Sequence, residues 1–110
     1  MEKMVFDALK SAAAEVRDGR NGVLLMVETI DRRKAKRLAS EFAFRSYQAN
    51  GVLTFVFGDE DLKTQLMHDL ILQVRSSLMV LLVVVTDPGR VSNVDPAVVR
   101  EGMFDFKITV

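Results

Sequence analysis

Apolar side chains recur every three or four positions along residues 2–18, which is the spacing of one buried face on an α-helix. They lie at Val5, Leu9, Ala12, Ala13 and Val16. The segment DGRNG at 18–22 follows, and its two glycines and asparagine are typical of a turn. The sequence therefore predicts a first, amphipathic helix that ends before the chain turns into an apolar stretch.

Four stretches predict β-strands. GVLLMVE at 22–28 is apolar at consecutive positions, so we expect a strand that is buried on both faces and central in its sheet. GVLTFVF at 51–57 predicts a second strand, and LMVLLVVVT at 78–86 predicts a third. FDFKITV at 104–110 alternates apolar and polar side chains, which predicts an edge strand with one polar face. Its connection is long enough for either a parallel or an antiparallel orientation.

Helical spacing returns between the first two strands. Residues 31–49 carry a second stripe, with Ala35, Leu38, Ala39, Phe42 and a later Tyr47. Thr29 or Asp31 is expected to cap its start, and Asn50 with Gly51 is expected to end it.

A third stripe follows the second strand. GDED at 58–61 predicts a turn and cap, and the stripe itself lies at Leu62, Leu66, Met67, Leu70, Ile71 and Val74. After the third strand, a polar loop leads to a short helical candidate, PAVVREG, at 96–102. The predicted order is thus a helix, then strand–helix–strand–helix–strand, then a short helix and an edge strand. This alternation favours one α/β domain over residues 1–110, with a layered, mostly parallel sheet and right-handed crossovers.

Composition narrows the classes of function. The 110 residues include 15 basic and 15 acidic side chains, so the formal net charge is zero and any electrostatic recognition must be local. There is no cysteine, which removes disulfides, thiolate ligands and thiol nucleophiles. The N-terminus lacks the apolar run of a secretion signal, and the longest apolar run, 78–85, is far shorter than the roughly 20 residues of a membrane-spanning helix. We therefore expect a soluble cytoplasmic protein.

The loops that follow the strands hold the candidate ligand-binding residues, because the carboxyl ends of parallel strands gather at one edge of a sheet. They are Arg32 and Arg33 after the first strand, Asp59 after the second and Asp87 after the third. Arginines at a helix start suit a phosphate, and the carboxylates suit a divalent cation. Asp31 and Asp59 are better explained as helix caps or first-turn acids, so we predict neither a metal site nor a cofactor.

Two other features, a basic run and a single histidine, indicate a functional site less strongly. The run DRRKAKR at 31–37, with Arg45, suits either nucleic acid or a solvated helix face. Phe42 belongs to the core stripe, so no interleaved stacking platform is evident and the solvated face is favoured. His68 is the only histidine, which leaves no zinc pattern and no nucleophile–base pair.

The closing stretch VDPAVVREGMFDFKITV is similar to the second region of homology of the AAA ATPases. That family has an Asp-Pro-Ala-Leu run, an Arg-Pro-Gly-Arg turn, then Phe-Asp and an Ile-rich strand. The positions that match are Asp95, Pro96, Ala97, Arg100, Gly102, Phe104, Asp105 and Ile108. The resemblance covers residues 84–110. It implies that Arg100 reaches a neighbouring subunit and that Asp87 stands about where the family has a sensor Asn.

The chain also departs from that family. Met103 replaces the second arginine, Glu101 replaces the proline, and no glycine lies between Gly22 and Gly51. Phosphate loops need glycines so that consecutive backbone amides can point at the anion, so we do not expect nucleotide binding after the first strand. The match is either a degenerate relative that keeps an oligomer-contacting edge without catalysis or the coincidence of a capped short helix leading into an amphipathic strand.

These patterns favour a non-enzymatic α/β interaction or regulatory module. We expect it to act through its edge strand and helix faces, in a homo-oligomer or with a protein partner, and Arg90 and Arg100 are the expected contact residues. The alternative is a small-molecule or phosphate-ester binding protein, or an enzyme, that uses Arg32, Arg33, Asp59 and Asp87 at the strand ends. Nucleic-acid binding is the least favoured function.

Overall fold

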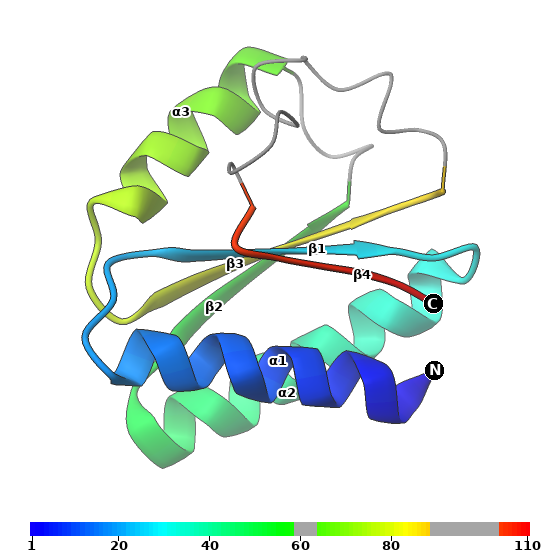
Figure 1. Ribbon diagram of the computed structural model, residues 1–110, viewed down its shortest axis with the longest axis horizontal. Helices are drawn as coiled ribbons and strands as arrows, with labels where there is room; N and C mark the ends of the chain where they lie inside the picture. The colour runs from blue at the N-terminus through cyan, green and yellow to red at the C-terminus, as the bar shows by residue number, and fades with distance from the viewer. Residues whose placement is uncertain (59–63, 89–103) are drawn as a thin grey trace.

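The computed structural model describes residues 1–58, 64–88 and 104–110, and the side chains of 64–68 are outside this description. The described residues form a four-stranded sheet between helices, with the order β2-β3-β1-β4 (Figure 1). The strands are β1 Val23–Glu28, β2 Leu53–Gly58, β3 Val80–Thr86 and β4 Phe106–Thr109. All neighbouring strands are parallel, which confirms the predicted α/β class and shows that the last strand is parallel as well.

In the described ranges, three helices cover the two faces of the sheet. They are α1 Glu2–Arg17, α2 Arg32–Asn50 and α3 Thr64–Arg75. Figure 1 shows α1 and α2 together on one face and α3 on the other. The chain moves one way along the sheet from β1 to β2 and back from β2 to β3, and two crossovers of the same hand then place their helices on opposite faces.

The central position predicted for the first strand is confirmed. β1 lies between β3 and β4, and all six of its residues are buried, as are all seven of β3. β4 lies at one edge and alternates partly buried Phe106 and Ile108 with exposed Lys107 and Thr109. The central strands have apolar sequences because both of their faces are buried. The edge strand β4 alternates apolar and polar residues because only one of its faces packs against the core.

Most of the predicted helix stripes are buried. All five apolar residues of the α1 stripe are in the core, and in α3 both Ile71 and Val74 are buried. In α2 the prediction for Tyr47 is wrong, because Tyr47 is exposed and Ser46 is buried instead. Ser46 lies four residues after Phe42, so it continues the same helix face, whereas Tyr47 lies about 100° further round the helix.

The boundaries of α2 follow the expected local chemistry. A side-chain oxygen of Asp31 accepts a hydrogen bond from the backbone N–H of Lys34, and the hydroxyl of Thr29 accepts one from the N–H of Asp31. Gly51 ends the helix with a left-handed φ of 74°, and its N–H donates to the carbonyl of Tyr47 at 2.9 Å. Asp31 is thus the N-cap, and the glycine stop is confirmed.

Two predicted features differ or cannot be placed. β3 begins at Val80, two residues after the predicted start, because Leu78 and Met79 form the turn that precedes it and Met79 has a positive φ of 60°. The turn residues 59–61, Leu62 and the short helix expected at 96–102 lie outside the described residues, as do the side chains of Leu66, Met67 and His68.

Candidate functional site

Polar side chains meet at the carboxyl ends of β1 and β3, as the parallel sheet predicts. Glu28 and Thr86 are register partners on these strands, and both are buried. The N–H of Thr29 donates to the carbonyl of Thr86 at 2.8 Å, which holds the two strand ends together. The hydroxyl oxygen of Thr86 is buried and has no hydrogen-bond partner among the residues that the structure describes. A buried hydroxyl without a partner is costly, so it is a candidate contact for a ligand at this edge.

Two of the four predicted ligand-binding residues lie together at this edge. The Nε of Arg32, in the first turn of α2, is 3.1 Å from Oδ1 of Asp87, which follows β3. Arg33 is exposed beside it, and Asp59 lies outside the described residues. Because a protein carboxylate already contacts the Arg32 guanidinium, an added phosphate would have to share or displace that carboxylate.

The edge strand contributes two polar groups that were not singled out from the sequence. The Nζ of Lys107 is 3.0 Å from Oε1 of Glu28, and the hydroxyl of Thr109 is 3.4 Å from Oε2 of the same carboxylate. The alternation of β4 placed both residues on its polar face, but only the strand order shows that β1 supplies their partner. The ion pair neutralises the largely buried Glu28 carboxylate.

Asp105 is a second buried carboxylate, at the opposite end of β4. Its side chain is 5% exposed, and it forms ion pairs with Arg75 at 3.0 Å and with Arg20. One of its oxygens also accepts the backbone N–H of Leu24 at 2.8 Å. This carboxylate joins β4 to β1, to α3 and to the turn after α1, so its role is structural.

The other edge of the sheet, formed by β2, has exposed apolar side chains. Leu53 and Phe55 of β2 are 43% and 37% exposed, and Leu78, next to the residue whose carbonyl accepts the N–H of Leu53, is 69% exposed. The rings of Phe55 and Phe57 stack with their centroids 6.4 Å apart. No charged residue occurs in β2, whereas β4 carries Lys107. Natural edge strands are usually protected by charge, proline or brevity, and β2 has none of these protections along its six residues.

The remaining predicted residues and chemistries cannot be assigned to this site. Arg90 and Arg100 lie outside the described residues, together with most of the segment similar to the AAA ATPases. In the part of the chain that the structure describes, no group of three or more acidic or histidine side chains could hold a metal ion. None of the helices in the same ranges is both long and apolar enough to cross a membrane.

Comparison of the chain with protein-family models, with curated proteins and with solved structures gave no match. Inference about function therefore depends on the geometry of the strand ends, the two sheet edges and the helix faces.

Proposed function

We propose that this chain is a non-enzymatic interaction module that self-associates through the β2 edge. The observation that supports the proposal is an uncharged edge strand with exposed Leu53 and Phe55. The sequence pattern had directed attention to the last strand, but β4 is shorter than β2 and is protected by Lys107. β2 is the edge with more exposed apolar surface.

The backbone of β2 is suitable for adding another strand. The N–H of Leu53 donates to the carbonyl of Met79, at the start of β3, so the backbone groups of Leu53 face the sheet. Backbone groups alternate in direction along a strand, and those of Thr54 and Val56 therefore face away from β3. They offer donors and acceptors to an added strand, which is the basis of β-augmentation.

A second copy of the chain fits this edge. Two β2 strands paired antiparallel about a two-fold axis present the same uncharged sequence to each other, so no like charges become opposed. Leu53 and Phe55 of both copies would then share one face, where their exposed area becomes buried. Burial of apolar area contributes roughly 25 cal/mol per Å². Arg90 and Arg100 remain proposed contact residues in such an assembly.

Substitution of Phe55 by lysine tests this association. We expect the wild-type chain to sediment as a dimer at micromolar concentration and Phe55→Lys to sediment as a monomer, because a lysine from each copy would lie on the same face of the paired strands. Met4→Lys is the matched control, since Met4 is also exposed but lies on α1. Analytical ultracentrifugation measures the masses, and circular dichroism checks folding.

A second variant distinguishes loss of association from loss of folding. Thr54→Pro removes one outward-facing N–H and leaves the pairing with β3 in place, as proline on an edge strand can. We expect this variant to be monomeric too. A monomeric wild type, or a folded Phe55→Lys variant that remains a dimer, would contradict the proposal.

A second candidate function is the binding of a small molecule or phosphate ester at the strand ends, favoured by the buried, unpartnered hydroxyl of Thr86. A ligand selective for the folded state at 100 times its Kd would stabilise it by about 2.7 kcal/mol. Thermal unfolding with sugar phosphates, nucleotides and Mg²⁺ measures this effect, and Thr86→Val should abolish it. A melting temperature that none of these additions raises would eliminate this candidate.

A further inference from the structure

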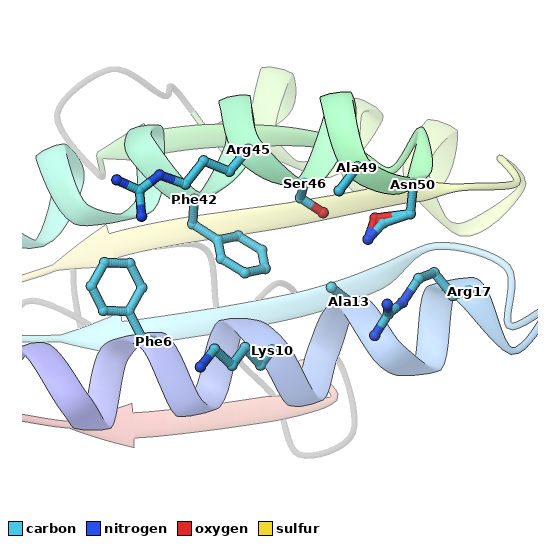
Figure 2. Close-up of a pocket in the computed structure, with 9 residues that line it drawn as sticks. All are labelled: Phe6, Lys10, Ala13, Arg17, Phe42, Arg45, Ser46, Ala49 and Asn50. Atoms are coloured by element: carbon cyan, nitrogen blue, oxygen red, sulfur yellow. The ribbon is translucent and has the colours of Figure 1, made fainter.

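A groove runs between α1 and α2 on their side of the sheet, and no sequence motif pointed to it (Figure 2). Its volume is about 380 Å³, within the usual range for small-molecule sites. Small residues, Ala13, Ser46 and Ala49, line its middle, and the bulkier Phe6 and Phe42 line it further along. Small side chains on facing helices leave space between them, which explains why the groove forms here.

The charges around the groove all have one sign. Lys10 and Arg17 come from α1 and Arg45 comes from α2, and none of the described residues that line the groove is acidic. In the described ranges, these three side chains make neither a hydrogen bond nor an ion pair. The chain as a whole has a formal net charge of zero, so this is a local concentration of positive charge. Such a concentration attracts anions.

Two buried oxygen atoms in the groove have no hydrogen-bond partner in the described part of the chain. They are Oγ of Ser46 and Oδ1 of Asn50. Ser46 is only 6% exposed, and Figure 2 shows its hydroxyl directed from α2 toward the gap between the helices. A buried polar group without a partner destabilises the free protein, and a bound ligand would supply the missing partner. The amide of Asn50 can rotate to present either its oxygen or its nitrogen.

The groove differs along its length. Figure 2 places Asn50 and the guanidinium of Arg17 toward one end, Ser46 near the middle, and the rings of Phe6 and Phe42 toward the other end, where the guanidinium of Arg45 also lies. From this arrangement we propose that the groove binds a small amphipathic carboxylate with an aromatic body. The carboxylate accepts hydrogen bonds from Arg17 and Ser46, and the body packs against the two phenylalanine rings, with Lys10 nearby.

The cations are not explained by helix stability alone. Arg17 lies in the last turn of α1, where a cation suits the helix macrodipole. Lys10 lies in the middle of α1, where this effect is absent. A solvated lysine or arginine is ordinary on a helix, but the coincidence of three cations with two unpartnered buried oxygens is not.

Binding of 4-phenylbutyrate, with 4-phenylbutanol as its uncharged counterpart, tests the site. In two-dimensional ¹H–¹⁵N NMR, we expect 4-phenylbutyrate to shift amides of residues 6–17 and 42–50 and to saturate. The alcohol should bind at least about tenfold more weakly, the loss expected for one charge-assisted hydrogen bond. Arg17→Met should weaken binding to a similar extent, whereas Lys3→Met, which removes a charge elsewhere on α1, should leave it unchanged.

Ser46→Ala provides an independent readout. We expect it to weaken 4-phenylbutyrate binding and to raise the stability of the free protein, because it removes a buried hydroxyl without a partner. A purely structural serine would give lower stability instead. Absence of saturable shifts at millimolar 4-phenylbutyrate, equal affinity for the alcohol, or shifts confined to the strand ends would each overturn the proposal. None of these results depends on the β2 edge.

Discussion

At the scale of single residues, Asp105 shows how one carboxylate can fix several elements at once. It accepts the backbone N–H of Leu24 and forms ion pairs with Arg75 and Arg20. Arg20 also pairs with Glu15 at 2.6 Å, so a chain of alternating charges extends from the buried carboxylate to the surface. Substitution of the buried Asp105 should therefore lower the free energy of unfolding more than substitution of the exposed Arg20.

Asp105→Ala tests this difference. We expect it to lower the free energy of unfolding by about 3 kcal/mol, because the N–H of Leu24 loses its side-chain acceptor and both arginines lose the buried carboxylate that they share. Arg20→Gln should cost less than about 1 kcal/mol, since Arg20 is largely exposed and Arg75 still pairs with Asp105. Urea denaturation measures both values. Equal losses for the two variants would show that burial of Asp105 is not what makes the interaction strong.

The burial of a side chain could be predicted from the sequence only where the pattern of its own helix or strand determines it. The α1 stripe was found completely because helical period alone fixes which face is buried. Asp105 appeared as one of several polar residues in an alternating strand, and its burial depends on Arg75 of α3 and Arg20 of a turn. Ser46 was missed because a small polar residue gives no hydropathy signal, although its helical spacing from Phe42 could have indicated it.

At the scale of elements, the turn between α1 and β1 is fixed by contact with α3. The N–H of Gly22 donates to the carbonyl of Ser77 at 3.0 Å, and Gly22 has a positive φ of 46°. A Cβ on Gly22 would lie 1.8 Å from the carbonyl oxygen of Val74. Gly51, at the end of α2, also has a positive φ, but a Cβ there would meet no atom within 4 Å. Comparison of the two glycines therefore distinguishes the cost of a left-handed backbone from the cost of steric overlap.

Alanine substitution at both glycines measures the two effects. Gly51→Ala should cost about 1–2 kcal/mol, the penalty of a left-handed backbone for a residue with a Cβ. Gly22→Ala should cost at least about 3 kcal/mol, because overlap with the end of α3 is added to the same penalty. Thermal or urea unfolding gives the comparison. Similar losses would mean that α3 moves away from the turn with little loss of stability.

The type of each described element was predictable, whereas its neighbours were not. Uninterrupted apolar sequence identified β1 as central, and alternation identified β4 as an edge. No sequence pattern indicates the order β2-β3-β1-β4, because every apolar strand could pair with any other. That order brings Lys107 to Glu28 and leaves β2 at the second edge, so neither this ion pair nor the exposed β2 edge could be predicted from the sequence.

At the scale of the whole molecule, the two faces of the sheet are covered unequally. α1 and α2 lie side by side on one face, and the groove with Lys10 and Arg17 forms between them (Figure 2). On the face that carries α3, Leu53 and Phe55 of β2, whose register partners Val80 and Leu82 pack against α3, remain exposed. The proposed ligand site and the proposed association edge are therefore separate, so ligand binding and self-association can be tested independently in one molecule.

The central position of β1 also affects how the chain reaches this fold during synthesis. Both neighbours of β1 come from much later in the sequence, since its register partners are Leu81–Thr86 and Phe106–Thr109. On the ribosome, VLLMVE therefore emerges long before either partner strand has been translated. A nascent chain in this state exposes an unpaired apolar strand, and such states are prone to aggregate. Expression at a lower temperature, or together with a chaperone that binds unfolded chains, should therefore increase the yield of native protein.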